Sequence, residues 1–550
     1  MDELSILIGG KAGDGIRQAG TIIGKLIGRL GYRIFLYDDY PSLIRGGHNF
    51  SVIRASGKKV LAHKDKVDII VALNQDTVEK HHEALTKNGI ILYDSDKVKS
   101  EGVGLPFSQI VKEHEGAPIM RNTAAIGAFA KMIGAEWSLL ERVIKDTEKK
   151  ATSLNLKIAE ASYRLVGQRF FDMKQLPLKP LPIVSGNEAI ALGAVQAGLN
   201  LYIAYPMTPA SSILHYLASH EDELGIVTVH PENEIAVAVM ALGAAYAGAR
   251  TMVGTSGGGF ALMTEAISLA SQGEYPVVFV ECQRAGPSTG VPTYTMQADL
   301  HFVLNAGHGD IVRFVVAPGD TEEAFYLTAL AMNIAWEFQI PTFVLSDKHL
   351  SESLFSFDPD TIEIGASEPL LWDKKAPYKR YSFAPNGVSP LAFPGDPEAT
   401  VKGTSYEHDE YGITTEDPAK IQKMQDKRLS KKPALKKRLQ QIEQVKIYGN
   451  ENSKTAIICW GSTKGVCTEI AEELDIKVVQ PLIMEPFPVE SLKNTLADVN
   501  KVIDIETNAT GQLARLLACN GITIHETILR YDSRPFTVDG LLNRVKEVIS

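Results

Sequence analysis

The chain has 550 residues, 45% hydrophobic and 22% charged, so it is long enough for three or four globular domains of ordinary composition. Its formal net charge of −10 argues against nucleic acid as the main partner, because phosphate binding needs an excess of Lys and Arg. The start of the chain lacks the apolar core of a secretory signal, and the longest apolar run, 235–249, is shorter than the roughly 20 residues that span a bilayer.

Strand-like runs alternate with helical patterns, which predicts an α/β fold of three α/β domains with mainly parallel sheets. We expect the first domain at residues 1–175, then a proline-rich extended linker, and the second domain at 183–365. Residues 366–445 lose the regular pattern, and their aromatic side chains favour a packed loop or lid over a disordered linker. The third domain is expected at 446–550.

A glycine-rich turn, Gly9–Gly15, follows the first expected strand, as the phosphate-binding turn of a dinucleotide domain would. Its glycines are out of register with G-x-G-x-x-G, so a tight strand-to-helix turn that needs glycine explains it about equally well. A basic turn, Arg45-Gly-Gly-His-Asn49, adds a second place in this domain where an anion can bind.

In the second domain, Tyr205-Pro-Met-Thr-Pro209 lies between an expected strand and a helix. Thr208 is a candidate N-cap, and Pro209 suits the first helical position because its missing N–H costs nothing there. One interpretation is an ordinary strand-to-helix turn. The other is that the helix N-terminus and the Thr208 hydroxyl face a carboxylate.

Glu234 begins an almost wholly apolar helix. It either stabilises the helix dipole or, if buried, stays protonated and donates a hydrogen bond. Thiamine diphosphate needs such an acid against its aminopyrimidine ring. Glu232, two residues earlier, is the second candidate for this role.

Another glycine-rich turn begins at Thr255-Ser256-Gly257, again between a strand and a helix. It lacks the Lys-Ser/Thr ending of a P-loop. The chain also lacks a Gly-Asp-Gly signature with a downstream Asn, which usually holds the metal and diphosphate of thiamine diphosphate. We therefore expect this chain to contact the pyrimidine end of that cofactor without holding its diphosphate.

Arg284 follows an apolar strand that should be buried on both faces, and open α/β sheets bind ligands at that end of their strands. Its planar guanidinium suits a carboxylate, although pairing with a structural acid is also open. The loop behind it offers backbone donors and the hydroxyls of Ser288, Thr289 and Thr293.

Lys and Arg recur at helical spacing over 420–438, a pattern that most often marks a solvated face. Docking of a coenzyme A phosphate or of an acidic electron carrier is the alternative. The four cysteines lie far apart without Cys-x-x-Cys spacing, so we expect reduced thiols, no metal site and no iron–sulfur cluster in this chain. Any metal centre that carries electrons must then belong to another chain.

Taken together, these motifs resemble the alpha subunit of 2-oxoacid:ferredoxin oxidoreductases that carry the gamma domain fused at the N-terminus, most closely the 2-oxoglutarate type. The resemblance extends to Gly387-Val-Ser-Pro390, Trp460-Gly-Ser-Thr463 and Arg530–Phe536, and so covers essentially the whole chain. Met207 stands where the family motif usually has isoleucine, a change of similar volume.

The resemblance implies a cytoplasmic enzyme that converts a 2-oxo acid and coenzyme A to acyl-CoA and CO2 while reducing ferredoxin. A beta subunit would hold the Mg²⁺, the [4Fe–4S] cluster and the diphosphate of thiamine diphosphate, in a dimer of alpha–beta heterodimers. Glu234, Arg284 and Thr208 would be catalytic. Three further sets are implied: substrate-binding Tyr205, Ser288, Thr289 and Thr293, pyrimidine-binding Glu232, Thr255, Ser256 and Gly257, and coenzyme A-binding Gly13, Arg45 and His48.

Three alternatives stay open. The same chemistry on pyruvate or on branched or aryl 2-oxo acids is the nearest. An NAD(P)-dependent dehydrogenase that uses the N-terminal domain is less favoured, because the glycine spacing is out of register. A scaffold subunit that contributes no side chain to the chemistry is the third.

Overall fold

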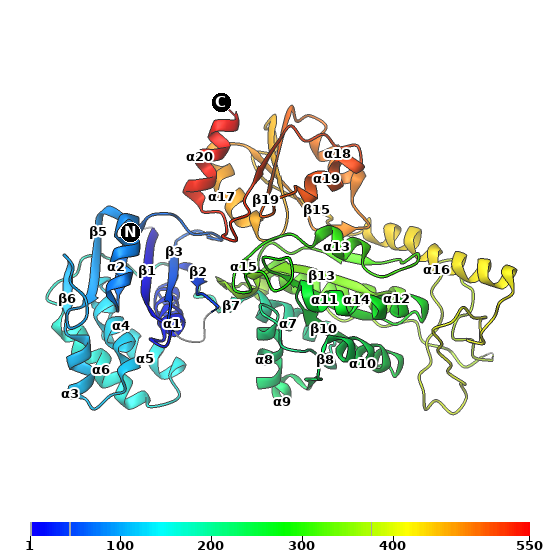
Figure 1. Ribbon diagram of the computed structural model, residues 1–550, viewed down its shortest axis with the longest axis horizontal. Helices are drawn as coiled ribbons and strands as arrows, with labels where there is room; N and C mark the ends of the chain where they lie inside the picture. The colour runs from blue at the N-terminus through cyan, green and yellow to red at the C-terminus, as the bar shows by residue number, and fades with distance from the viewer. Residues whose placement is uncertain (1–2, 43–45, 376, 550) are drawn as a thin grey trace. The chain divides into compact units, whose positions relative to one another are not determined.

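The computed structural model describes residues 3–42, 46–375 and 377–549, which form two compact units (Figure 1). The first unit comprises Met1–Ser185, Glu352–Asp358 and Phe536–Ser550, and the second comprises Gly186–Ser351 and Pro359–Pro535. The predicted α/β class with mainly parallel sheets is confirmed. The predicted domain boundaries stay a prediction.

The first unit contains an eight-stranded sheet. Its order is β6 (Val103–Leu105), β5 (Leu85–Asp94), β4 (Val67–Ala72), β1 (Glu3–Lys11), β3 (His48–Ser56), β2 (Arg33–Asp39), β14 (Leu354–Ser356) and β7 (Ile183–Ser185). Strands β1, β4, β5 and β6 are parallel, whereas β3 runs antiparallel between β1 and β2. The sequence pattern did not reveal β3, because its start coincides with the glycine-rich basic turn.

Helices of the first unit bury apolar faces in one core with this sheet; in α1, for example, Ile23, Leu26 and Ile27 are fully buried. These helices are α1 (Ile16–Arg29), α3 (Phe107–Glu113), α4 (Arg121–Met132), α5 (Trp137–Thr147) and α6 (Thr152–Leu165). The unit also contains α2 (Gln75–His81) and α20 (Val538–Ile549). The C-terminal α20 joins this unit because the Val538 N–H donates to the His63 carbonyl at 3.0 Å, and Asp539 accepts from the Asp65 N–H at 2.8 Å.

The larger sheet of the second unit has seven strands, parallel except for β18. Its order is β18 (Ile483–Glu485), β12 (Phe314–Val316), β13 (Thr342–Asp347), β11 (Val277–Gln283), β10 (Thr251–Thr255), β8 (Leu201–Ile203) and β9 (Val227–Val229). The accompanying helices are α7 (Gly186–Gln196), α8 (Ser211–Ser219), α9 (Glu221–Leu224), α10 (Glu234–Tyr246), α11 (Gly257–Leu262), α12 (Thr264–Gln272), α13 (Leu300–Asn305), α14 (Thr321–Phe338) and α15 (Lys348–Glu352).

A five-stranded sheet completes the second unit and shares one hydrophobic core with the larger sheet. Its order is β15 (Val445–Gly449), β17 (Lys477–Pro481), β16 (Thr455–Cys459), β19 (Lys501–Glu506) and β20 (Glu526–Leu529), with helices α17 (Thr463–Leu474), α18 (Val489–Leu496) and α19 (Gln512–Cys519). A buried ion network also joins the two sheets, since the Lys464 ammonium contacts Asp320 at 2.6 Å and Glu323 at 2.7 Å.

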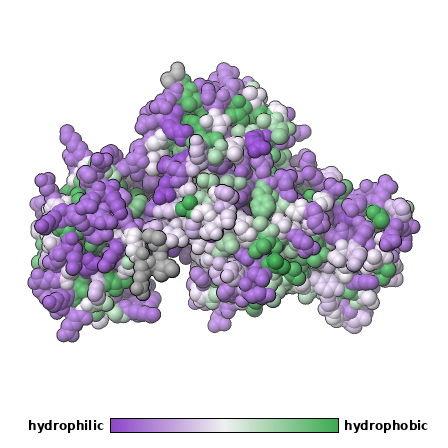
Figure 2. Space-filling model, in the orientation of Figure 1, coloured by the Kyte–Doolittle hydropathy of each residue, from purple (hydrophilic) through white to green (hydrophobic). Residues whose placement is uncertain are grey.

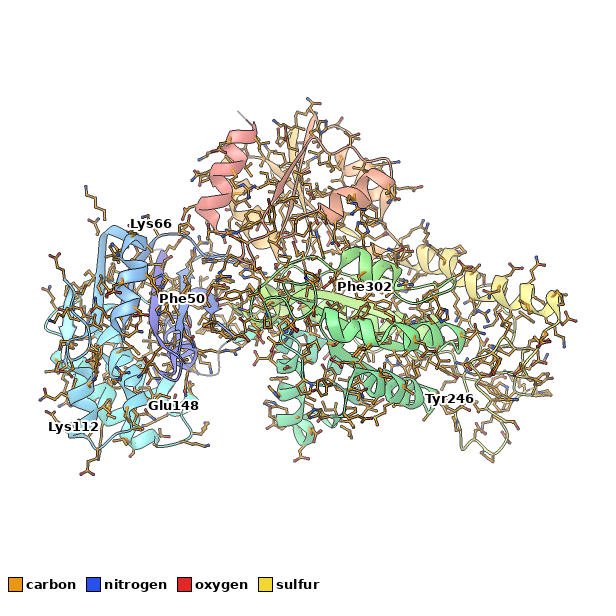
Figure 3. All side chains as sticks on the ribbon, in the orientation of Figure 1. Phe50, Lys66, Lys112, Glu148, Tyr246 and Phe302 are labelled. Carbon is orange, nitrogen blue, oxygen red and sulfur yellow. The ribbon has the colours of Figure 1, made fainter. Side chains whose placement is uncertain are left out.

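The irregular segment after residue 366 is packed, as its aromatic residues predicted. Tyr378 and Tyr381 are buried, and the Tyr246 hydroxyl at the end of α10 donates to the carbonyl of Val401 at 2.8 Å (Figure 3). The Lys-rich stretch forms α16 (Pro418–Leu439), as expected from its helical spacing.

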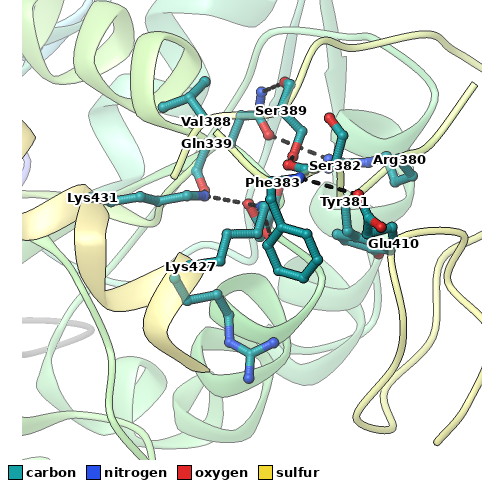
Figure 4. A network of polar contacts seen from close by, with 12 residues as sticks. Gln339, Arg380, Tyr381, Ser382, Phe383, Val388, Ser389, Glu410, Lys427 and Lys431 are labelled. Carbon is teal, nitrogen blue, oxygen red and sulfur yellow. Dashed lines mark hydrogen bonds and ion pairs between the residues drawn. The ribbon is translucent and has the colours of Figure 1, made fainter. Parts of the chain in front are cut away.

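The prediction that this helix is mainly a solvated face is wrong for one side of it. Lys427 and Lys431 are buried, and their ammonium groups contact the Glu274 carboxylate at 2.7 and 2.5 Å (Figure 4). Burial alone would raise the pKa of Glu274, but Lys427, Lys431 and Arg380 outweigh it and hold that pKa well below its usual range. Lys427 and Lys431 are therefore buried because their ammonium groups pair with Glu274, which lies 153 and 157 positions earlier in the chain.

Candidate functional site

The predicted site residues of the second unit follow four neighbouring strands, in the order β11, β10, β8 and β9. These strands are parallel, so their carboxyl ends lie at the same edge of the sheet. Tyr205 and Thr208 follow β8, Glu232 and Glu234 follow β9, Thr255 ends β10, and Arg284 follows β11.

Arg284 and Thr208 are in direct contact. The Arg284 Nη1 donates a hydrogen bond to the main-chain carbonyl of Thr208 at 2.9 Å. Arg284 is half-buried, and burial lowers the pKa of its guanidinium, an effect that the neighbouring Glu281 opposes. The contact fixes one edge of the guanidinium and leaves its other N–H groups available to a ligand.

The turn at Thr208 differs from the predicted N-cap. Helix α8 begins at Ser211 with Ala210 at the cap position, and the peptide bond between Thr208 and Pro209 is cis. Asn187 holds the turn instead, because its side-chain amide donates to the Pro209 carbonyl at 2.8 Å and to the Ser212 hydroxyl at 2.7 Å. The Thr208 side chain is thus not used as a helix cap.

Glu234 is buried at the start of α10, with 3% of its surface exposed. The cap of this helix is Asn233, whose side chain accepts from the Ala236 N–H at 3.0 Å. The Glu234 Oε1 has no hydrogen-bond partner among the residues that the structure describes. A buried carboxyl oxygen without a partner is costly, which indicates that a ligand group satisfies it. Glu232, in contrast, is exposed.

The turn after β10 lies directly against Glu234. A Cβ atom on Gly259 would come within 2.5 Å of the Glu234 Oε1 and 2.1 Å of the Thr255 Oγ1, so only glycine allows this approach. The Ser256 hydroxyl is also buried without a partner in the described part of the chain. Ser256 occupies the cap position of α11 but makes no side-chain cap. Glu234 and Thr255 therefore lie side by side at this turn, with the unpartnered Ser256 hydroxyl next to Thr255 in the chain.

The loop after Arg284 separates the expected substrate-binding hydroxyls into two groups. Ser288 and Thr289 lie on its exposed tip, whereas Thr293 is buried and its hydroxyl has no partner among the described residues. Main-chain bonds between Ala285 and Val291 close the base of this loop. Tyr205 is 38% exposed, and its ring lies edge-on to His230 with centroids 5.8 Å apart.

Two acids at this edge of the seven-stranded sheet were not predicted from the sequence. Glu281 is buried on β11, three residues before Arg284, and Asp299 lies against it at the start of α13. Burial and the Asp299 carboxyl raise the pKa of Glu281 well above its usual range. An acid at the end of an apolar strand was a signal for Glu281, but no local pattern pointed to Asp299.

The expected coenzyme A residues lie in the first unit. Gly13 has a φ of 95° and open space around its Cα, and its neighbours Lys11 and Asp14 line a cavity of about 700 Å³. Further residues of this cavity are Asn74, Lys97, Lys112 and Arg121. His48 on β3 contacts the His81 ring, with 2.8 Å between the two Nε2 atoms. Arg45 lies outside the described residues.

No group of three or more His, Cys, Asp or Glu side chains in residues 3–42, 46–375 and 377–549 is arranged to hold a metal ion. No helix in those ranges is both long enough and apolar enough to cross a membrane.

Comparison with known proteins gives consistent family matches. Residues 192–427 match the family described as pyruvate flavodoxin/ferredoxin oxidoreductase, thiamine diP-binding, and residues 5–165 match pyruvate ferredoxin/flavodoxin oxidoreductase. The chain is 32% identical to the alpha subunit of 2-oxoacid:ferredoxin oxidoreductase 2 from Aeropyrum pernix, over 100% of this chain and 98% of the relative. It is 31% identical to the 2-oxoglutarate synthase subunit KorA of Methanocaldococcus jannaschii, over 59% of this chain and 88% of the relative.

A solved structure matches the whole chain. It is the 2-oxoglutarate:ferredoxin oxidoreductase from Magnetococcus marinus with 2-oxoglutarate, coenzyme A and succinyl-CoA bound, with a TM-score of 0.90 and 31% sequence identity. The match covers 100% of both chains.

Proposed function

Because this chain belongs to the family of 2-oxoacid:ferredoxin oxidoreductase alpha subunits, we propose that it catalyses the oxidative decarboxylation of 2-oxoglutarate. The products are succinyl-CoA, CO2 and reduced ferredoxin, formed in the cytoplasm. The observation that carries the proposal is the edge of the seven-stranded sheet where Glu234 has an unpartnered buried oxygen and Arg284 is fixed to Thr208. The substrates of the two 2-oxoglutarate relatives favour 2-oxoglutarate over pyruvate or branched and aryl 2-oxo acids.

The residues around Glu234 fit the pyrimidine end of thiamine diphosphate. The Glu234 carboxyl would hydrogen-bond to the pyrimidine ring, with Thr255, Ser256 and Gly257 beside it and the exposed Glu232 at the rim. When bound, the cofactor supplies the carbon nucleophile of the reaction. The Glu234 carboxyl would orient the ring through this hydrogen bond, and the backbone of the glycine turn would keep water from that contact.

Arg284 and the Thr208 turn would bind the 1-carboxylate of the 2-oxo acid. The guanidinium keeps N–H donors beyond the one bonded to Thr208, and the buried Thr293 hydroxyl adds an unpartnered donor. The charge of Arg284 stabilises the carboxylate before CO2 leaves. Tyr205 would lie at the rim of this subsite, and the tip with Ser288 and Thr289 would cover it.

A partner subunit would complete the site. The face of α10 that continues from Glu234 exposes Ile235, Val239 and Met240, and α11 adds Leu262. Figure 2 shows hydrophobic side chains gathered over α10 and α11. Such a patch beside an incomplete site is typical of an interface. We assign it to a beta subunit that carries the cofactor diphosphate, Mg²⁺ and a [4Fe–4S] cluster, in a dimer of heterodimers that reduces ferredoxin.

Coenzyme A would bind to the first unit. The open turn at Gly13 borders the cavity of about 700 Å³, whose lining includes Lys11, Lys97 and Lys112. These cations suit the phosphates of coenzyme A. Arg45 and His48 belong to the same proposal.

The test is an assay of the assembled alpha–beta complex with a viologen dye as electron acceptor and a panel of 2-oxo acids. We expect dye reduction that depends on both coenzyme A and 2-oxoglutarate, with lower kcat/KM for pyruvate. Preference for another 2-oxo acid would refute the substrate, and reduction of NAD(P) in place of the dye would refute the reaction.

A further inference from the structure

A buried glutamate, Glu281, and a half-buried aspartate, Asp299, form an acidic pair beside the substrate arginine. The Glu281 side chain is fully buried, and neither of its carboxyl oxygens has a hydrogen-bond donor among the described residues. The Asp299 carboxyl lies against Glu281, and its Oδ2 is 3.0 Å from the position that a Cβ on Gly257 would occupy. The pair thus lies between Arg284 and the glycine turn of the cofactor subsite.

Few charged groups face Glu281. Its neighbours in the adjacent strands are Thr255 on β10 and Leu345 on β13, neither of which is charged. The titratable and charged groups around it are Asp299 from the start of α13 and Arg284 from the end of its own strand. Arg284 uses one N–H on the Thr208 carbonyl and forms no hydrogen bond to Glu281 in the described structure.

Two carboxylates in contact and out of water do not both ionise, because each negative charge opposes the other. Burial and Asp299 raise the pKa of Glu281 well above its usual range. Burial raises the pKa of Asp299 as well, and the contact with Glu281 offsets part of that rise. A proton on Glu281 supplies the donor that this contact otherwise lacks, and Asp299 is the member that carries the charge.

We propose that Glu281 and Asp299 share one proton, which keeps Glu281 neutral next to Arg284 and leaves the guanidinium charge free for the carboxylate of the 2-oxo acid. An ionised Glu281 would compete with the substrate for Arg284. Both acids are therefore positioning residues that act through Arg284. The role toward substrate rests on the proposed function, whereas the shared proton does not.

The kinetic test measures KM and kcat of the assembled complex for 2-oxoglutarate as the pH is raised. In the wild type, KM should rise at alkaline pH by roughly tenfold or more, the effect of losing a charge-assisted hydrogen bond, when Glu281 ionises. Glu281→Gln cannot ionise and should keep the low KM throughout. Asp299→Asn removes the opposing charge, lowers the pKa of Glu281 and should move the rise in KM to lower pH.

The matched control is Asp504→Asn on β19. Asp504 is also buried beside a second acid, Glu506, with both oxygens unpartnered in the described structure, and burial raises its pKa. This variant should keep the wild-type KM profile. A Glu281→Gln variant whose KM rises as the wild type does, or an Asp299→Asn profile that does not move to lower pH, overturns the proposal.

An infrared measurement separates this proposal from the proposed function. At neutral pH the wild-type complex should show a protonated-carboxyl band to which both Glu281 and Asp504 contribute, so that Glu281→Gln and Asp504→Asn each remove a different part of it. If no 2-oxo acid is turned over, the proposed function fails while this band still tests the shared proton. Identical carboxyl bands in the wild type and Glu281→Gln would overturn the pair itself, and Glu281→Leu gives the same comparison if Glu281→Gln does not fold.

Discussion

Glu234 and Glu274 are buried glutamates of the same unit, but their carboxylates have opposite surroundings. Glu274 contacts the ammonium groups of Lys427 and Lys431, and Arg380 adds a third positive charge nearby. Glu234 has a buried oxygen with no partner among the described residues. A satisfied buried ion holds a fold together, whereas an unsatisfied one is expected where a ligand completes the contact.

The surroundings of the two glutamates therefore differ as those of a structural ion cluster, at Glu274, and of a binding site, at Glu234, would differ. Around Glu274, buried ion pairs hold the charged helix α16 through Lys427 and Lys431, and Arg380 of the irregular segment donates to the Glu274 main-chain carbonyl at 2.8 Å (Figure 4). On the turn that lies against Glu234, the Ser256 hydroxyl is buried and unpartnered as well. The same substitution, Glu to Gln, should therefore have opposite consequences at the two positions.

The largest effect is expected for Glu234→Gln. Loss of a positioned acid should lower kcat by about 10²–10⁴-fold, because an amide cannot take part in proton transfer with the pyrimidine ring. The free energy of unfolding should change little, since no hydrogen bond to the Oε1 is lost. Dye-reduction kinetics and urea unfolding of the same preparation check both parts, and unchanged turnover would remove Glu234 from the site.

Glu274→Gln should act on stability. It leaves two buried lysines without a counter-charge, a change that typically costs about 3–5 kcal/mol. Urea unfolding of the variant should show this loss. A stability equal to the wild type would mean that the cluster does not hold the segment in place.

Arg284→Ala should lower kcat/KM roughly 30- to 5,000-fold, because a charged contact to the substrate carboxylate is lost. This factor corresponds to a loss of about 2–5 kcal/mol of transition-state stabilisation. Arg284→Lys is the control, since it keeps the charge but not the planar fork, and it should lie between the alanine variant and the wild type. Assembly with the partner subunit, measured by size-exclusion chromatography, should be unchanged. Equal kcat/KM values for the wild type and Arg284→Ala would exclude the carboxylate role.

The smallest expected effect is a change in the free energy of unfolding at acidic pH. The folded pKa of Glu274 is held below its unfolded value, so its ionised form stabilises the fold above the unfolded pKa of about 4.3. This stabilisation, about 2–3 kcal/mol, is lost as the pH falls through the folded pKa. The difference in unfolding free energy between wild type and Glu274→Gln should therefore shrink in acid. A difference independent of pH would contradict the assignment of charge.

Part of the site was predictable because it depends on local patterns. Each of four residues lies at or just after the end of an apolar strand: Thr208, Glu234, Thr255 and Arg284. Because these strands are parallel, their ends lie at one edge of the seven-stranded sheet. The cap at Thr208 was predicted wrongly, since Asn187, from another helix, holds that turn. Asp299 was missed because nothing adjacent to it in the sequence signals its contact with Glu281.

The sequence by itself determined the α/β order of elements, the absence of cysteine spacing for a metal centre, and the residues that end each strand. These properties follow from the period of apolar residues and from turn chemistry, both of which act over a few neighbouring positions. Only the tertiary structure decided that Lys427 and Lys431 turn inward, that Glu281 meets Asp299, and that α20 joins the first unit. Each of these depends on burial against residues distant in the chain, and burial raises the free energy of a charged group unless another group pairs with it.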